Sequence, residues 1–498
     1  MSTPLRVSPT RVIVLVVAIL AVLAGMVLAV RPLVAPVAAV GDPVFSPYVD
    51  VTATPSYEFQ TPHDQYGRDV TLSFVVAAAA TACEPSWGGA YSLAQADESL
   101  SLDRRIAQLR ATGGQARVSF GGQAGTELAA ACTDATALEK AYLAVVERYD
   151  LASIDLDVEG AGLADVATTA RRATALATLQ AARPVAVWLT LPSTPVGLTD
   201  QGIAQLDALL GAGVDVAGVN AMAFDFGASK DAGTGTVDAI TADLGAVQAQ
   251  VRAAWSRAGS SIDDDQAWEH VGVTVMIGQS DVGSERLTIA DAGAVNAFAR
   301  TVGLGQVSMW SLNRDATCGY PLPDVLEVVQ TSCSGIDQKG QSFAATLGDG
   351  LAGVARPVPS VSATAATASP TAADDPATSP FTVWDPLTVY VGGTKVVWRH
   401  QVYQAGFYST GIAPDTVASV GAGSPWKLLG PVLPGDRPAP APSVAVGTYP
   451  QWDGATAYVA GERVQVGTVP YAARFWTKGD RPGVPMVGGS PWSLVATG

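Results

Sequence analysis

From about residue 43 to residue 335, short apolar segments with the pattern of β-strands alternate with longer segments that have a helical pattern. The strand-like segments recur eight times, and each gap between them has room for a helix. Eight strand–helix units in under 300 residues predict an α/β fold of the (β/α)8 barrel type. A doubly wound sheet is the alternative, but the even spacing of the units favours a closed barrel.

The segments behind this prediction have clear limits in the sequence. The predicted strands are Val44–Val49, Val70–Ala77, Ala116–Phe120, Ser153–Asp157, Val185–Leu191, Val216–Met222, Val271–Ile277 and Gln306–Leu312. The predicted helices include Leu102–Ala111, Ala135–Tyr149, Ala164–Ala182, Asp200–Leu210, Val237–Arg257 and Ile289–Val302. In a barrel of this kind, the active site lies at the C-terminal ends of the strands.

The fourth predicted strand and its end have three carboxylates at alternate positions. Asp155, Asp157 and Glu159 share one face of this strand, because successive side chains of a strand point to opposite faces. Such a pattern in isolation most often marks a solvated strand face, and a divalent metal site is a second alternative. The strands of a parallel barrel are covered on both sides, however, so solvent does not explain an acidic face here. Carboxylates about 7 Å apart repel, so we expect one of them to hold its proton near neutral pH and to serve as a general acid.

The charge and the histidine content exclude some classes of function. The net charge of −16 over 498 residues argues against nucleic acid or an anionic membrane surface as a partner. The three histidines, His63, His270 and His400, are far apart in the sequence and argue against a multi-histidine zinc centre. No cofactor or metal is indicated.

The N-terminus has the pattern of a targeting segment, residues 1–40. Arg6 and Arg11 precede an uninterrupted apolar run from Val12 to Val30, which is long enough either for a signal peptide or for a membrane anchor. Cleavage after Ala39 is one possibility. In both cases the basic residues before the run predict that the rest of the chain faces the exterior, secreted or anchored through residues 12–30.

The four cysteines fit an exported protein. Cys83, Cys132, Cys318 and Cys333 allow three pairings. We favour Cys83–Cys132, because both follow consecutive predicted strands, and Cys318–Cys333, because this pair closes a short loop. Free buried thiols are the alternative.

The composition changes after the predicted barrel. Residues 353–380 are dominated by Ala, Thr, Ser and Pro and are predicted to be a flexible linker. Two short modules follow, at 381–431 and 447–498, with a Pro-rich linker at 432–446 between them. Nine positions recur at an offset of 68 residues, which is a strong repeat signal. The matched pairs are Trp384/Trp452, Tyr390/Tyr458, Gly393/Gly461, Val396/Val464, Tyr403/Tyr471, Ala405/Ala473, Phe407/Phe475, Gly411/Gly479 and Pro414/Pro482.

The modules are small, lack cysteine and are predicted to be all-β. Their aromatic residues are too many for so small a core, so we expect one or two in each module to face solvent and to stack on sugar rings, while the others hold the fold. The candidates for sugar binding are Trp384, Tyr403, Trp426, Trp452, Tyr471, Trp476 and Trp492.

Four motifs in residues 43–335 resemble those of bacterial-type chitinases of glycoside hydrolase family 18, in the order that the family has. On the third predicted strand, Ser119-Phe120-Gly121-Gly122 resembles Ser-x-Gly-Gly, and on the fourth, Asp155-x-Asp157-x-Glu159 resembles Asp-x-x-Asp-x-Asp-x-Glu. On the sixth, Met222-Ala223-Phe224-Asp225 resembles Met-x-Tyr-Asp, and on the eighth, Met309-Trp310-Ser311-Leu312-Asn313-Arg314-Asp315 resembles the strand with the family's tryptophan floor. The C-terminal modules are similar to chitin-binding modules of carbohydrate-binding families 5 and 12.

Two positions depart from the family pattern. The first Asp of the acidic motif falls on Ala152, which is the motif position farthest from the chemistry. The Tyr of Met-x-Tyr-Asp falls on Phe224, which cannot donate a hydrogen bond to the substrate's acetamido group. The second departure puts the rate in question more than the type of reaction.

The resemblance implies hydrolysis of β-1,4 bonds beside N-acetylglucosamine with retention, in which the substrate's own acetamido oxygen attacks the anomeric carbon. By the matching positions, Glu159 is expected to protonate the leaving oxygen and later to activate water. Asp157 is expected to orient the acetamido nitrogen, and Asp155 to tune the pair by sharing a proton. Asp225 would contact the acetamido group, and Trp310 would form the floor under the sugar.

Further residues are candidates to line the cleft: Met222, Phe224, Asn220, Gln279 and Asp281. Trp87 is expected either to stack on a sugar or to pack in the core. The resemblance implies chitin or N-acetylglucosamine oligosaccharides as the partners of a monomeric enzyme. A non-catalytic glycan-binding protein on the same barrel is the main alternative, although the presence of Glu159 favours an enzyme. An enzyme acting on peptidoglycan or N-glycan cores is another, against which the C-terminal modules argue.

Overall fold

The computed structural model describes residues 44–79, 81–319, 326, 328–351, 374, 379–386, 388–415, 423–437, 443–484 and 490–495. The predicted targeting segment, with its apolar run Val12–Val30, lies outside the described residues, as do most of the linker 353–380 and part of the linker 432–446. Residues Asp42–Gly498 form one unit, separate from Met1–Gly41.

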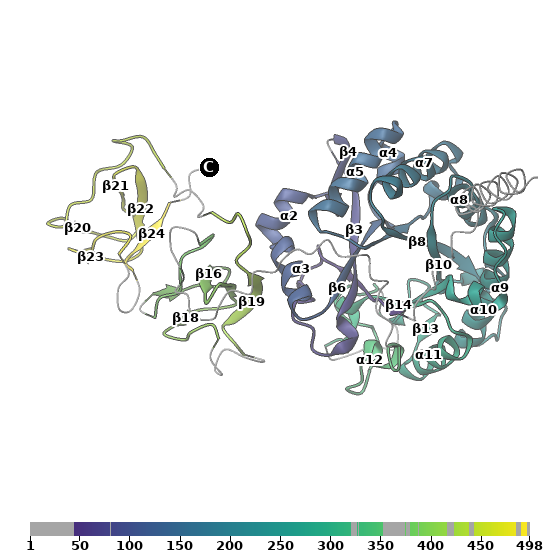
Figure 1. Cartoon of the computed structure of the whole chain (residues 1–498). Helices are drawn as coiled ribbons and strands as arrows, with labels where there is room; N and C mark the ends of the chain where they lie inside the picture. The colour runs from purple at the N-terminus through teal and green to yellow at the C-terminus, as the bar shows by residue number, and fades with distance from the viewer. Residues whose placement is uncertain are drawn as a thin grey trace, which may run out of the picture. The chain divides into compact units, whose positions relative to one another are not determined.

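A parallel sheet forms the centre of the described part of this unit (Figure 1). Its strands follow one another in chain order, with β14 beside β11 and β1 beside β14. All eight predicted strand positions are confirmed: β1 (Val44–Phe45) with β2 (Tyr48–Asp50), β3 (Asp69–Ala78), β6 (Gln115–Gly121), β7 (Ser153–Asp157), β8 (Ala186–Thr194), β10 (Val216–Met222), β11 (Val271–Met276) and β14 (Gln306–Trp310).

The first predicted strand is split into two short strands. β1 pairs in parallel with β14 only, and β2 pairs in parallel with β3 only, so the strand ladder is not continuous around the ring. Pro47 lies at the break and has no N–H to donate to a ladder. The segment is still bonded on both sides, because Ser46 N donates to Val307 O at 2.9 Å and Thr71 N donates to Pro47 O at 2.9 Å. This segment therefore connects the two ends of the parallel sheet.

Helices surround the sheet, as Figure 1 shows, and each predicted helix is present. Their apolar sides are buried against strands that are buried on both faces; all six residues of β11, for example, are buried. Among the helices of the described residues, none is both long and apolar enough to cross a bilayer. The helices are α3 (Leu102–Ala111), α5 (Ala135–Arg148), α7 (Val166–Ala182), α8 (Asp200–Gly211), α9 (Thr236–Arg257) and α11 (Ile289–Val302).

Several shorter elements were not predicted. β4 (Thr81–Trp87) pairs antiparallel with β3 and is followed by β5 (Tyr91–Ser92) and α2 (Leu93–Leu100). The alanine-rich sequence at the turn between β3 and β4 has little strand propensity, so it gave no signal of its own. The other short elements are α4 (Leu128–Ala131), α6 (Ala161–Ala164), β9 (Gly197–Leu198), α10 (Asp264–Glu269), β12 (Gly278–Gln279), β13 (Arg286–Leu287) and α12 (Phe343–Leu347).

Both predicted disulfides are present. Cys83 on β4 bonds to Cys132 after α4, with 4.7 Å between their Cα atoms. Cys318 bonds to Cys333, with 5.1 Å between their Cα atoms. The alternative of free thiols is therefore wrong. The first disulfide joins β4 to the end of α4, and these two elements follow the neighbouring strands β3 and β6.

The two C-terminal repeats have the same strand arrangement. In the first module, β16 (Lys395–Trp398), β17 (Gln401–Ala405) and β19 (Trp426–Pro431) form an antiparallel sheet, and β15 (Val389–Tyr390) pairs with β18 (Ser409–Thr410). The second module repeats this with β21 (Arg463–Val466), β22 (Val469–Ala473), β24 (Trp492–Leu494), β20 (Ala457–Tyr458) and β23 (Thr477–Lys478). Each has a small core of equivalent residues: Tyr390, Val396, Ala405 and Trp426 in the first, and Tyr458, Val464, Ala473 and Trp492 in the second.

Candidate active site

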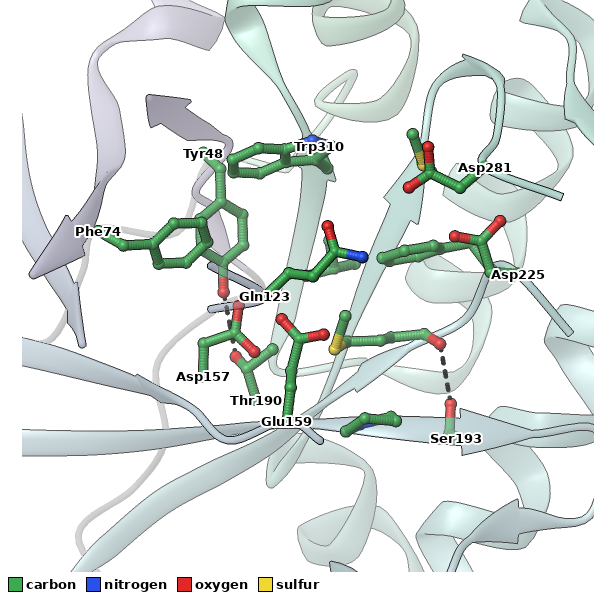
Figure 2. A pocket seen from close by; sticks show the side chains of 15 residues that line it. Tyr48, Phe74, Gln123, Asp157, Glu159, Thr190, Ser193, Asp225, Asp281 and Trp310 are labelled. Atoms are coloured by element: carbon green, nitrogen blue, oxygen red, sulfur yellow. Dashed lines mark hydrogen bonds between the residues drawn. The ribbon is translucent and has the colours of Figure 1, made fainter. Parts of the chain in front are cut away.

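A pocket of about 260 Å³ opens at the carboxyl ends of the parallel strands. Side chains from β2, β3, β7, β8, β10, β11 and β14 line it, so residues far apart in the sequence meet there. Figure 2 shows Asp157 and Glu159 pointing into the pocket, with an aromatic group on one side and Asp225 and Asp281 on the other. The lining residues are Tyr48, Phe74, Gln123, Asp157, Glu159, Thr190, Pro192, Ser193, Met222, Phe224, Asp225, Thr274, Met276, Asp281 and Trp310.

The acidic motif follows the predicted alternation. All five residues of β7 are buried, and Val158 N continues the pairing by donating to Thr190 O at 3.0 Å. Gly160 has a φ of +52° at the N-cap of α6, so the chain turns directly after Glu159. Glu159 is thereby held at the end of the strand, with its side chain in the pocket.

Three hydroxyl groups hold Asp155 below the pocket. Tyr48 and Ser119 donate to one of its oxygens at 2.8 and 2.7 Å, and Thr190 donates to the other at 2.6 Å. Burial raises the pKa of Asp155, and these hydroxyl donors oppose that rise because they favour the charged form. Asp155 is thus a fixed group that accepts hydrogen bonds on both carboxylate oxygens, and its charge acts on Asp157.

Asp157 and Glu159 form a coupled pair. Burial raises the pKa of Asp157 most, and the negative charges of Glu159 and Asp155 raise it further. Burial also raises the pKa of Glu159. One oxygen of Asp157 is buried and has no hydrogen-bond partner among the described residues. Both shifts favour the retention of a proton by the pair.

Gly121 and Gly122, at the end of β6, leave space for the backbone of β7 at Asp157. β6 and β7 align Ser119 with Asp155 and Gly121 with Asp157. A Cβ on Gly121 would lie 2.0 Å from the Asp157 carbonyl oxygen, and its φ of +104° disfavours other residues. Gly122 N donates to the same carbonyl at 3.0 Å. The donor role of Ser119 toward Asp155 was not predicted.

An aromatic wall borders the pocket beside the acidic pair. Trp310 on β14 stacks on Phe74 of β3, with 5.4 Å between the ring centroids, and Tyr48 lies 5.9 Å from Trp310. Trp310 was predicted at this place, whereas Phe74 and Tyr48 were missed. Both are single aromatics in otherwise ordinary strand segments, so the sequence offered no signal beyond their position near a strand end.

The opposite side of the pocket comes from β10 and the segment after β12. Met222, Phe224, Asp225 and Asp281 line it as predicted. Asp225 has a φ of +54° and accepts a hydrogen bond from Val282 N at 2.9 Å. Burial and then the charge of Asp225 raise the pKa of Asp281. The region is therefore acidic, and Phe224 presents a ring with no hydroxyl group.

A buried carboxyl lies behind the wall of the pocket. The Ser193 hydroxyl is 2.5 Å from Asp243 on α9 and 3.2 Å from the Met222 carbonyl oxygen. Asp243 is fully buried, and burial raises its pKa to about 7. Neither Ser193 nor Asp243 was predicted, because their partners are far apart in the sequence.

Three predicted contact residues lie outside the pocket lining. Trp87 is fully buried and donates to the Tyr149 hydroxyl at 2.9 Å, so its prediction as a stacking site is wrong and the core alternative is correct. Gln279 is buried and bonds both the N–H and the carbonyl of Leu326 at 2.9 Å. Asn220 is buried and donates to Thr190 and Thr274 at 3.0 and 2.6 Å. Asn220 therefore orients two hydroxyl groups of the pocket lining, whereas Gln279 holds the backbone of Leu326.

The predicted sugar-binding aromatics of the modules differ in exposure. Trp426 and Trp492 are buried, and Trp384, Tyr403, Trp452 and Tyr471 pack against the small cores. Large rings supply the apolar area that so small a fold needs, so the prediction of Trp426 and Trp492 as exposed binding residues is corrected. The other four are half-buried, and their role in sugar binding stays a prediction. Trp476 is exposed as predicted. The exposed aromatic patches are Phe407 with Tyr408, 51% and 62% exposed, and Phe475 with Trp476, 50% and 62% exposed.

Comparison with known proteins supports a glycoside hydrolase. No protein-family model matches the chain. A probable bifunctional chitinase/lysozyme of Escherichia coli (strain K12) is 31% identical over 292 residues, which are 56% of this chain and 32% of that protein. Endochitinase 11 of Metarhizium anisopliae is 30% identical over 286 residues, 55% of this chain and 52% of that protein. The chain thus spans between about a third and about half of the length of these relatives.

Solved structures show the same fold. The catalytic domain of a hyperthermophilic chitinase from Pyrococcus furiosus matches with a TM-score of 0.51 and 24% identity, over 62% of this chain and 95% of that one. Catalytic-site mutants of active domain 2 of a thermostable chitinase from the same organism, complexed with chito-oligosaccharides, match with a TM-score of 0.51, 24% identity, and 61% and 94% coverage.

Proposed function

We propose that this chain is a chitinase of glycoside hydrolase family 18, which uses a (β/α)8 barrel to hydrolyse β-1,4 bonds between N-acetylglucosamine units with retention. The observation that supports this most is the coupled pair Asp157–Glu159 at the end of β7, in a pocket with Trp310 on its wall. The identity to chitinases over more than half of the chain supports the same reaction class.

Glu159 and Asp157 divide the acid chemistry between them in this proposal. The substrate's acetamido N–H donates to the carboxyl group of Asp157, which lines the pocket, and this bond favours the charged form of that carboxyl. The proton shared by the pair then resides on Glu159, which gives it to the glycosidic oxygen as the bond to the leaving sugar breaks. The acetamido oxygen forms a bond to the anomeric carbon, and the resulting oxazolinium ion is stabilised by the negative charge of Asp157.

The second half of the reaction returns the enzyme to its starting state. Glu159, now ionised, takes a proton from a water molecule that attacks the anomeric carbon from the side of the departed sugar. The bond to the acetamido oxygen breaks, and the product keeps the configuration of the substrate. Asp155, fixed by its three hydroxyl donors, holds the nearby negative charge that keeps the pair protonated.

We also propose that the C-terminal repeats are chitin-binding modules. The two aromatic patches are equivalent in the repeat and directly precede β18 and β23. Exposed aromatic rings stack on the apolar faces of sugars, and two weak sites on one chain bind a solid polymer more tightly than either alone. Export of the chain, as a secreted or anchored monomer, is part of the same proposal.

The first test is hydrolysis of soluble N-acetylglucosamine oligomers by residues 41–498, with products separated by length and anomer. We expect shorter oligomers with the β-anomer formed first. Glu159→Gln should retain fold and chitin binding but lose about three orders of magnitude in turnover. Near-normal turnover by this variant, or an initial α-anomer, would refute the mechanism.

A second candidate is a catalytically impaired glycan-binding protein, and Phe224 is the observation that favours it. The ring replaces a hydroxyl that the resemblance assigns to the acetamido group. Retained binding to chitin beads with no hydrolysis of any oligomer would support this candidate over the enzyme.

A further inference from the structure

The two repeats differ on the side away from their shared core. The first module has a second apolar cluster of Val397, Val402 and Leu429, against which Phe381 and Val432 pack. The offset between the repeats is 68 residues up to β22 and 66 residues at β24, where Trp492 matches Trp426. At the equivalent positions the second module has Gln465, Pro470 and Val495. The side chain of Gln465 forms its hydrogen bonds within its own module, since it accepts one from Tyr449 N at 2.8 Å and donates one to Gly467 O at 2.7 Å. The apolar side of the first module is thus interrupted in the second by the buried amide of Gln465.

Helix α3 lies against this side of the first module, within the unit Asp42–Gly498. Gly430 on β19 has a φ of +143°, and a Cβ there would lie 2.4 Å from the Arg104 carbonyl oxygen. A bulge in the pairing of β17 with β19 occurs at this point. A glycine at a bulge allows the strand backbone to touch the helix backbone, an approach that a side chain would prevent.

Arg104 of α3 joins the helix to the chain after β19. It donates to Pro431 O at 2.6 Å and forms two hydrogen bonds with Asp436, at 3.0 and 3.3 Å. The two side chains are 5% and 16% exposed. The guanidinium also lies 5.9 Å from the centre of the Phe381 ring. A charge so fully paired and covered indicates a contact that excludes water.

Polar contacts at the edges complete the junction. Lys395 of β16 donates to Glu98 O at 3.0 Å and to Ser101 Oγ at 2.8 Å, at the turn between α2 and α3. Gln60 donates to Leu428 O at 3.0 Å and is held by Arg105 at 2.9 Å. The second module has Arg463 at the position of Lys395, and Arg463 bonds Tyr449 of its own module.

We infer that the first module docks on helix α3 as a fixed part of the catalytic body, and that the second module has lost or never acquired the docking side. The repeats then share an aromatic patch but have different mechanical roles. The first patch moves with the pocket, and the second is free of this junction. If the proposed function holds, the docked patch extends the surface along which a chitin chain is presented to the pocket.

Hydrogen–deuterium exchange of α3 in residues 41–498 tests the docking without any substrate. Lys395→Glu reverses a docking charge, and Arg463→Glu is the matched change at the equivalent position of the second module. We expect the first variant to raise exchange of the α3 amides by about tenfold and the second to leave them unchanged. Asp436→Ala, which lies outside the module's sheet, should act like Lys395→Glu while exchange in β16 and β17 stays slow.

Equal α3 exchange in the parent and in both docking variants would overturn the inference, whether or not the protein hydrolyses chitin. The proposed function fails on a different measurement, the turnover of soluble oligomers, so the two failures are distinguishable. If Lys395→Glu unfolds the first module, exchange in β16 and β17 rises as well, and Asp436→Ala alone then decides.

Discussion

In the pocket, the side chains proposed to act on the substrate are charged and buried, whereas those on the repeated modules are aromatic and exposed. Burial raises the pKa values of Asp157 and Glu159, which favours the protonated form of these carboxyl groups. Phe407 and Trp476 need no such environment, because the apolar area of a ring is useful only where a sugar can reach it. The pocket is proposed to act through charges whose pKa values are set by burial. The modules are proposed to act through apolar ring surface that stays exposed to solvent.

The sharpest separation of the two regions is expected from Asp157→Asn. The amide keeps the shape but removes the charge that stabilises the transition state, so turnover of a soluble oligomer should fall by about a hundredfold to a thousandfold. Adsorption to chitin beads should not change. Turnover within about threefold of the parent would mean that Asp157 has no electrostatic role.

Removal of all four exposed aromatics, Phe407, Tyr408, Phe475 and Trp476, to Ala is the converse experiment. Adsorption to chitin beads should weaken by about a hundredfold, because both stacking sites and their avidity are lost. Turnover of a soluble trimer should stay at the parent value. The control replaces Val391 and Val459, equivalent exposed residues of the two modules, by Ala and should leave adsorption unchanged. If both sets reduce adsorption equally, the patches are not the binding sites.

Asp243→Asn tests how much the buried carboxylate of Asp243 destabilises the folded protein when it is ionised. The folded-state pKa of about 7 lies above the ordinary value of 3.8, so the folded protein keeps a proton that the unfolded chain has lost. Stability from this group therefore falls as pH rises from about 4 to about 7, and the penalty persists above that range. We expect the Asn variant to be more stable by about 1–3 kcal/mol at pH 8 and unchanged at pH 4.

Chemical denaturation at both pH values measures this difference. Asp207→Asn is the control, because Asp207 is an exposed partner of Arg257 and should change stability by less than about 1 kcal/mol at either pH. A variant at position 243 that is less stable at pH 8 would show that the Asp243 charge is compensated in the fold.

The smallest expected effect comes from Phe224→Tyr. The added hydroxyl could donate to the acetamido oxygen and align it for attack, so kcat should rise by about threefold to tenfold with little change in KM. Phe226→Tyr, at a buried position two residues further on, should give no increase. An unchanged or lower kcat for Phe224→Tyr would mean that another group already aligns the acetamide.

The strand and helix positions could be predicted closely, because each has a strong periodic pattern and lies in a repeating topology. The acidic face of β7 followed from the same alternation, and Trp310 and Phe224 followed from the motifs. The support of Asp155 could not be predicted, since Tyr48 is 107 residues away and its hydroxyl has no local signature. The predictions for Trp87, Trp426 and Trp492 failed for one reason: ring size alone does not say whether a ring fills a core or stays exposed.

The first strand lacks one of its two partners during most of the synthesis of the barrel. Its segment Val44–Asp50 is bonded to both ends of the sheet, and its partner Ser308 lies 262 residues beyond Ser46. At a synthesis rate of 5–20 residues per second, this partner emerges roughly 15–50 s after the first strand. During that interval β3 can pair with the segment, but the edge meant for β14 stays open. Nascent chains are therefore most exposed to aggregation, and most dependent on chaperones, until the eighth strand arrives.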